Sequence, residues 1–237
     1  MPVRTHALPL VLPRGLRRAC SGVATFLILG CGPALAQVPG AGSTDDPCRP
    51  GGPGPAAGPL AGLAQPATAP DELLALVEIP AGSAIKYELH EASGRMEVDR
   101  FLAMPMAYPA NYGIFPCTVA GDGDALDVLV LTRAPVLPGA VLRVRPVGVL
   151  RMLDRGEEDD KILAVPVDAV DATFAPVREL ADLAPAERDR IEAFFRVYKN
   201  LPDPGVQVEV GPWEGRDAAL AVVREALAAA RAPEPEG

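Results

Sequence analysis

The sequence predicts an α+β domain in which a group of β-strands precedes two helices. Between residues 73 and 167, runs of apolar or alternating residues are separated by turn residues, which is the pattern of short strands. Two stretches with apolar residues at helical spacing follow these runs. Strands that come first and helices that come last indicate an α+β domain, and this number of short strands indicates a small barrel or sandwich.

Each predicted element is bounded by a change in residue pattern. The strands are expected at residues 73–79, 84–89, 95–102, 126–132, 141–153 and 161–167. The first helix is expected at about residues 185–198, and its apolar side is formed by Ile191, Phe194, Phe195 and Tyr198. The second is expected at about residues 216–231, is rich in alanine, and has Leu220, Val223 and Leu227 at the same spacing.

The N-terminal region reads as a targeting segment. Four arginines precede the uncharged run at residues 19–30, and Ala34-Leu35-Ala36 has the small-x-small form of a signal peptidase site. The run is too short to span a bilayer stably, so residues 1–36 are predicted to be an export signal. Because Ile28-Leu29-Gly30-Cys31 resembles the lipobox of bacterial lipoproteins, lipidation of Cys31 stays open beside cleavage after Ala36. Both alternatives place the protein outside the cytoplasm, either free in the periplasm or anchored to the membrane that faces it.

A linker separates this signal from the domain. Residues 37–70 are rich in Pro, Gly and Ala and contain neither an aromatic residue nor a period of 2 or 3.6, so they are predicted to form a disordered tether. The globular domain is then expected at residues 71–237. Outside the signal only Cys48 and Cys117 remain, so no disulfide framework is implied, although one bridge between them stays open.

Composition excludes several classes of function. The chain has 237 residues, 49% of them hydrophobic, which is enough for one sizeable core. The formal net charge of −9 argues against nucleic acid as a partner. His90 is the only histidine outside the signal. A zinc site with paired histidines would need a second one, and a Ser-His-Asp triad would depend on His90 alone, so the sequence argues against both kinds of site.

Two groups of acidic residues indicate a site for cations. Asp122-Gly-Asp124-Ala-Leu-Asp127 places three carboxylates at a turn that leads into an apolar strand, and the segment 154–160 ends another strand with five acids before a lysine. Such crowding costs free energy unless cations neutralise it. Either group alone would be interpreted as a solvated loop. Their combination with basic and tyrosine residues predicts a site for metal and anion together.

At this point the sequence resembles the family of soluble, Mg-dependent inorganic pyrophosphatases with an OB-type barrel. The resemblance runs from about Leu76 to the last helix. The matching segments are Val77-Glu78-Ile79-Pro80, Ile85-Lys86-Tyr87-Glu88, Val98-Asp99-Arg100-Phe101, Tyr108-Pro109-Ala110-Asn111-Tyr112-Gly113, Asp122 to Val128, Arg145 to Gly148, Asp154 to Lys161, and Phe194-Phe195 with Tyr198-Lys199. The resemblance implies a five-stranded OB-like β-barrel with additional strands and two C-terminal helices packed on it. It also implies hydrolysis of inorganic pyrophosphate to two orthophosphates with several Mg²⁺ ions in the site.

The resemblance also implies a role for each site residue. Asp122, Asp127 and Asp159 would bind the first Mg²⁺, Asp127 also the second, and Asp154 with Asp159 the third. Asp124 would be the general base. The phosphoryl oxygens would be held by Lys86, Arg100, Tyr112, Tyr198 and Lys199. The surrounding shell would be formed by Glu78, Tyr108, Lys161 and Glu88, of which Glu88 also counts with the metal-binding carboxylates.

Three features depart from the family pattern. Ala125 stands where the aspartate motif usually has Pro or Glu. On the first helix, Ala193 and Val197 replace the histidines that help some bacterial members form hexamers, which argues against a hexamer and leaves a homo-oligomer open. Export is unusual for a family that is mostly cytoplasmic. Two other functions stay open: an exported phosphohydrolase of relaxed specificity, and a non-catalytic OB module that binds polyanions or metal.

Overall fold

The structure is a computed structural model. It describes Cys48, Leu60, residues 62–90 and 93–202, Gly205, and residues 207–231. The expected export signal, Cys31 and most of the expected tether lie outside these residues. Within them, no helix is both long and apolar enough to cross a membrane.

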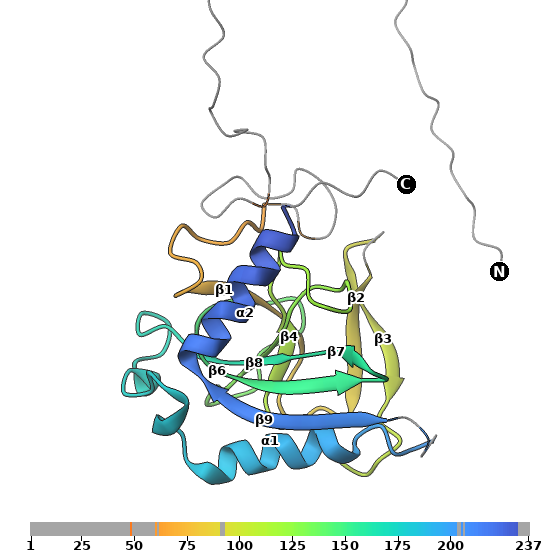
Figure 1. The fold of residues 1–237 in the computed structure, drawn as a ribbon. Coiled ribbons are helices and arrows are strands. Elements are labelled where there is room, and N and C mark those ends of the chain that lie inside the picture. The colour runs from red at the N-terminus through yellow and green to blue at the C-terminus, as the bar shows by residue number, and fades with distance from the viewer. Residues whose placement is uncertain are drawn as a thin grey trace, which may run out of the picture. The chain divides into compact units, whose positions relative to one another are not determined.

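Nine strands and two α-helices follow one another in the described part of the chain (Figure 1). The strands are β1 (Leu73–Ile79), β2 (Ile85–His90), β3 (Arg95–Phe101), β4 (Asn111–Ile114), β5 (Asp127–Val130), β6 (Val141–Asp154), β7 (Glu157–Glu158), β8 (Lys161–Pro166) and β9 (Val208–Gly215). The helices are α1 (Pro185–Val197) and α2 (Arg216–Ala229), and the short 3₁₀ helices are η1 (Ala172–Phe174) and η2 (Leu180–Asp182).

Five of the strands close into a barrel. The hydrogen-bonded order is β1, β4, β5, β8 and β6, and β6 pairs with β1 to complete the ring. Only the β5–β8 pairing in this ring is parallel. The long strand β6 makes the closure possible, because register shifts along it let successive segments pair with different neighbours. The predicted five-stranded barrel is therefore confirmed.

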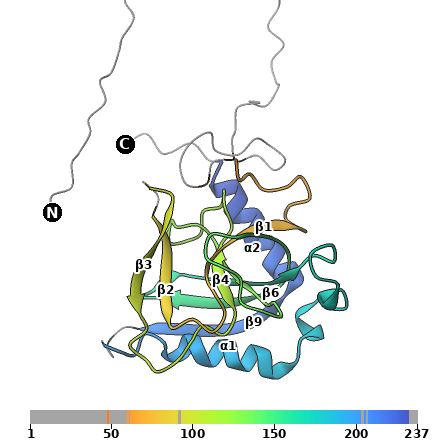
Figure 2. The same ribbon diagram turned by 180° about the vertical axis from the view of Figure 1, so that it is seen from behind.

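The remaining strands extend the barrel. Strands β7 and β9 pair with β6, whereas β2 and β3 form a separate two-stranded sheet that stands beside the barrel (Figures 1 and 2). Close packing of β4 on β1 needs a glycine, because a Cβ at Gly113 would lie 1.9 Å from the carbonyl oxygen of Leu76. This contact holds β4 near the centre of the site described below.

Each α-helix covers its own part of the core. Helix α1 buries Ile191, Phe194 and Phe195 in one cluster of apolar side chains, and α2 buries Val223 and Leu227 in another. Full burial of such a side chain contributes about 1.5–3 kcal/mol relative to exposure. The helical spacing read from the sequence therefore identified the buried faces correctly.

The sequence pattern found six of the strands and missed three. Strands β4 and β7 are short, and the β4 segment contains Gly113. Strand β9 contains Pro212, which argues against a strand in the interior of a sheet. Because β9 pairs with β6 alone, it is an edge strand in which a proline is tolerated.

The folded region begins before Asp71, so the expectation that the tether reaches residue 70 is wrong. The Gln65 side chain is completely buried, donates hydrogen bonds to the carbonyl oxygens of Leu74 and Pro116, and accepts one from the Leu74 N–H. These bonds attach residues 62–70 to β1.

The bridge that the sequence left open is present in the structure. Cys48 and Cys117 form a disulfide with a Cα–Cα distance of 5.2 Å. It joins residues 69 positions apart and ties a residue of the expected tether to the chain just before the Asp122 turn.

Candidate active site

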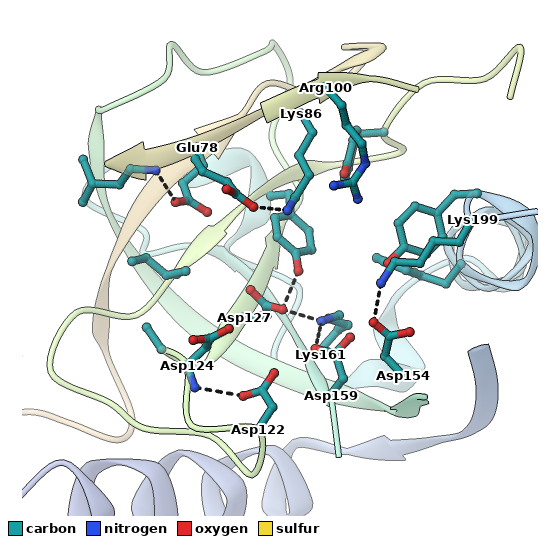
Figure 3. A pocket seen from close by; sticks show the side chains of 18 of the residues that line it. Glu78, Lys86, Arg100, Asp122, Asp124, Asp127, Asp154, Asp159, Lys161 and Lys199 are labelled. Carbon is teal, nitrogen blue, oxygen red and sulfur yellow. Dashed lines mark hydrogen bonds and ion pairs between the residues drawn. The ribbon is translucent and has the colours of Figure 1, made fainter. Parts of the chain in front are cut away.

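Every residue that the sequence predicted for the site lines one cavity of about 740 Å³. These residues come from the barrel, the β2–β3 hairpin and the end of α1 (Figure 3). They are Glu78, Lys86, Glu88, Arg100, Tyr108, Tyr112, Asp122, Asp124, Asp127, Asp154, Asp159, Lys161, Tyr198 and Lys199. The structure therefore brings the whole predicted set together.

The carboxylates lie where strands begin or end. Asp127 is the first residue of β5, Asp154 is the last of β6, and Asp159 precedes β8. Asp122 and Asp124 lie in the turn before β5, where the Asp124 N–H donates to Oδ1 of Asp122 at 3.0 Å. The turn reverses at Gly123, whose φ of 89° is costly for other residues. Strand ends thus place acids that are far apart in the sequence around one cavity.

Lys161 connects two of these carboxylates. Its ammonium group donates to Asp127 and to Asp159, and only 2% of its side chain is exposed. Burial lowers the pKa of Lys161, but the two aspartates outweigh this effect and the pKa is raised. Burial also raises the pKa of Asp159 to about 6, against the opposing effect of Lys161. A single lysine therefore compensates part of the charge of two half-buried acids.

Tyrosines and aromatic rings form one wall. The Tyr112 hydroxyl donates to Oδ2 of Asp127, the same atom that accepts from Lys161. The rings of Tyr108 and Tyr198 pack on Phe194 of α1, with centroid distances of 4.8 and 5.1 Å. Burial raises the pKa of all three tyrosines. Their hydroxyls therefore keep their protons at neutral pH and can donate hydrogen bonds.

Glu78 is a buried acid at the side of the cavity next to the hairpin. Burial raises its pKa to about 7, although the Leu89 N–H donates to Oε1 at 3.1 Å and lowers it in part. At neutral pH this group is therefore divided between its charged and neutral forms. Its contact with Leu89 links β1 to β2.

Three of the four cations that line the cavity, Lys86, Arg100 and Lys199, lie on the side away from Asp122 and Asp124 (Figure 3). Lys86 and Arg100 come from the β2–β3 hairpin, and both form ion pairs with Asp99. The Lys86 Nζ lies 3.2 Å from Oδ2 of Asp99. Lys199 follows α1 and pairs with Asp154. A cavity that has the Asp122 and Asp124 carboxylates at one end and these three cations at the other suits a polyanion that binds together with metal ions.

The chemistry of the acids fits Mg²⁺. Carboxylate oxygens are hard ligands of the kind that Mg²⁺ binds. Oδ1 of Asp154 is buried without a hydrogen-bond partner in the described region, so it has a lone pair to offer. No three Asp, Glu, His or Cys side chains among the described residues are already grouped closely enough to hold an ion. Three of these carboxylates are ion-paired instead: Asp127 and Asp159 with Lys161, and Asp154 with Lys199.

Several residues that complete the site were not among those predicted from the sequence. Asp99 belongs to the matching segment Val98-Asp99-Arg100-Phe101, but no role was predicted for it. In the structure it forms ion pairs with Lys86 and Arg100. Leu60 lines the cavity although it belongs to the expected tether, and its local sequence contains no signal for such a position. The other unassigned lining residues are Leu89, Ile114, Ala125 and Phe195.

Comparison with known proteins agrees with this geometry. The family model described as inorganic pyrophosphatase matches residues 75–231. The inorganic pyrophosphatase of Gluconobacter oxydans is 47% identical over 162 residues, which are 68% of this chain and 93% of that protein. That of Pseudomonas aeruginosa is 47% identical over 161 residues, 68% of this chain and 91% of that protein.

Solved structures show the same relationship. The crystal structure of an inorganic phosphatase from Anaplasma phagocytophilum is 44% identical with a TM-score of 0.70, and the match covers 72% of this chain and 99% of that one. The inorganic pyrophosphatase from Thermus thermophilus is 37% identical with a TM-score of 0.67, covering 70% of this chain and 94% of that one. The fold, the site and these relatives together show that the chain belongs to the inorganic pyrophosphatase family.

Proposed function

We propose that the protein hydrolyses inorganic pyrophosphate to two orthophosphates with Mg²⁺ in the cavity. The observation that supports this most strongly is that one cavity has the carboxylates of the Asp122–Asp127 turn at one end and Lys86, Arg100 and Lys199 at the other. Pyrophosphate is a small polyanion that repels an attacking hydroxide, so its hydrolysis needs cations around both phosphoryl groups. The relatives are named as enzymes of this activity.

Asp122, Asp127, Asp154 and Asp159 are the residues that would hold magnesium, with Glu88 near them. Bound Mg²⁺ would neutralise phosphoryl charge and lower the pKa of a water molecule. The chain's own contribution is to place hard oxygen ligands beside the substrate, fixed by the start of β5, the end of β6 and the residue after β7.

The proton and the substrate are handled by other residues. Asp124, in the turn beside Asp122, is proposed to accept the proton of the attacking water on its carboxylate. Lys86, Arg100 and Lys199 would stabilise the negative charge that develops on the leaving phosphate. Tyr198 would donate a hydrogen bond to a phosphoryl oxygen, and Tyr112 would do the same by turning its single hydroxyl proton away from Asp127, to which it donates in the structure. Lys161 keeps Asp127 and Asp159 oriented toward the cavity.

Substitution of the proposed base tests this assignment. We expect the full chain to release orthophosphate from pyrophosphate with Mg²⁺, and Asp124→Asn to lower kcat by about 10²- to 10⁴-fold while Mg²⁺ still binds. Asp189→Asn, an exposed change on α1, is the matched control and should leave kcat unchanged. A wild-type protein that is inert with Mg²⁺, Mn²⁺ and Zn²⁺ would refute the activity.

We also propose that the protein works outside the cytoplasm, released from an export signal after Ala36 or anchored through a lipid on Cys31. The Cys48–Cys117 disulfide supports this location, since disulfides persist in oxidising compartments such as the bacterial periplasm. N-terminal sequencing of the native protein, combined with membrane fractionation, separates the two forms. An intact Met1 in the cytosolic fraction would contradict both.

A further inference from the structure

Asp159, one of the proposed magnesium ligands, lies at a break between two pieces of one antiparallel ladder. On one side of the break Glu158 of β7 pairs with Leu153 of β6, and on the other side Lys161 of β8 pairs with Leu150 of β6. Two residues separate the paired positions on each strand, so the register continues across the break. The break is therefore a local change in hydrogen bonding and not an insertion of residues.

The Asp160 side chain takes over one hydrogen bond of this ladder. The Asp159 N–H donates to the Met152 carbonyl oxygen at 2.9 Å, as in a regular hydrogen-bonded pair. The return bond of such a pair would run from the Met152 N–H to the Asp159 carbonyl oxygen. In the structure the Met152 N–H donates to Oδ1 of Asp160 at 3.1 Å. A side-chain oxygen thus replaces a main-chain carbonyl, which lets residues 159–160 leave the regular course of the ladder.

Asp160 and Asp159 serve different sides of the chain. Asp159 and Lys161 line the proposed active site and form an ion pair there (Figure 3). Asp160 lines a different cavity, of about 470 Å³, together with Arg151 and Glu214. Asp160 is therefore not placed to bind a metal ion in the active site, and any effect that it has on the site must pass through the main chain.

Arg151 holds the Asp160 carboxylate where the Met152 N–H can reach it. One guanidinium nitrogen of Arg151 donates to Oδ2 of Asp160 at 2.5 Å, and another donates to Oε2 of Glu214 on β9 at 2.8 Å. Only 13% of the Asp160 side chain is exposed. Hydrogen bonds between charged groups are stronger than those between neutral ones. Each oxygen of this carboxylate therefore has its own partner, and the side chain has one defined orientation.

We infer that Asp160 is a positioning residue: by binding the Met152 N–H it sets the direction in which Asp159 presents its carboxylate to Mg²⁺. The inference rests on the proposed function and adds to it a residue outside the active-site cavity. Residues that orient a metal ligand from outside the coordination shell typically contribute about 10–100-fold to metal affinity. The expected effect is therefore on the binding of Mg²⁺.

Calorimetric titration of the full chain with Mg²⁺ alone tests the inference. Two double variants, Arg151→Gln/Asp160→Asn and Arg151→Gln/Asp160→Ala, have the same net charge and differ in the oxygen offered to the Met152 N–H. The variant with Asn keeps that acceptor, and the amide group can also donate to the new Gln side chain. The variant with Ala should bind Mg²⁺ about tenfold more weakly than the variant with Asn. Equal affinities would overturn the inference.

Kinetics add a measurement that a general loss of stability would not change in the same way. The Mg²⁺ concentration for half-maximal hydrolysis of pyrophosphate should be about tenfold higher for the variant with Ala than for the variant with Asn, with kcat at saturating Mg²⁺ within about twofold. A lower kcat with an unchanged Mg²⁺ requirement would contradict the positioning role. The titration contains no substrate, so it decides the inference even if pyrophosphate is not hydrolysed.

Hydrogen exchange in the metal-free wild type needs no variant and remains decisive if a double variant does not fold. Met152 is 2% exposed, and its N–H has Asp160 as acceptor, so this amide should exchange slowly, like the amides of the regular β6–β8 ladder. Exchange of the Met152 amide as fast as in an unfolded chain would show that the bond to Asp160 is not maintained, and would overturn the inference.

Discussion

The ammonium group of Lys161 lies against the carboxylate of Asp127 inside the cavity. The lysine side chain is almost completely buried, whereas 19% of the aspartate side chain is exposed. A buried charge is stable only when a partner compensates it. This pair therefore stabilises the folded protein around an acidic cavity. Both Lys161 and Tyr112 donate to Oδ2 of Asp127, so Oδ1 is the oxygen that can bind a metal ion.

Removal of the lysine should destabilise the metal-free protein. Lys161→Met leaves Asp127 and Asp159 buried without their cation, so the free energy of unfolding is expected to fall by about 3–5 kcal/mol. Urea unfolding measures this loss, and Mg²⁺ should restore part of it by replacing the missing charge. Equal stability of variant and wild type without metal would show that the pair is not needed.

Loss of charge at Asp127 should weaken metal binding and turnover together. This residue is proposed to serve two ions, so Asp127→Asn is expected to raise the Mg²⁺ concentration for half-maximal activity. Substitution of a residue that hydrogen-bonds to a metal ligand typically lowers metal affinity by about 10–100-fold. We expect at least this loss of Mg²⁺ affinity when a direct ligand is substituted. Asp189→Asn again provides the control on α1. An unaltered Mg²⁺ dependence would exclude the double role.

Stability of the metal-free protein should decrease as Glu78 ionises. Burial raises its pKa to about 7 from an ordinary 4.5, so the neutral form favours the folded state. That contribution is complete below about pH 4.5 and is lost as the pH rises through 7. Relative to Glu78→Gln, the wild type should therefore lose on the order of 3 kcal/mol between pH 4.5 and 8. Unfolding at a series of pH values measures this.

A control variant separates Glu78 from the other acids. Glu225→Gln, an exposed change on α2 outside the cavity, is the matched control and is measured over the same pH range. A constant stability difference between Glu78→Gln and wild type would mean that the Glu78 carboxyl titrates normally in the fold.

The disulfide should stabilise the domain. It closes a loop of 69 residues, so Cys48→Ser is expected to lower the free energy of unfolding by about 2–4 kcal/mol. A reducing agent should lower the stability of the wild type to that of the variant and leave the variant unchanged. The comparison is made by denaturant unfolding, and a reductant effect of equal size on both proteins would contradict it.

Local patterns in the sequence were sufficient for most elements and for the membership of the site. The runs that became β1, β6 and β8 are rich in apolar residues, and the α1 face repeats at helical spacing. Such patterns report burial directly, because a strand or helix must turn its apolar side to the core. The acids and bases of the site were equally visible, since their chemistry requires those residue types.

Tertiary structure alone decided the features that depend on distant partners. Strand β9 forms because it pairs with β6. The local sequence of β9, which contains Pro212, does not predict this pairing. The attachment of Gln65 to Leu74 and Pro116, and the pairing of Lys161 with Asp127 across 34 residues, depend on how the chain returns to itself. The physical reason is that these interactions are formed by groups far apart in the chain, and only the closed barrel brings them within contact distance.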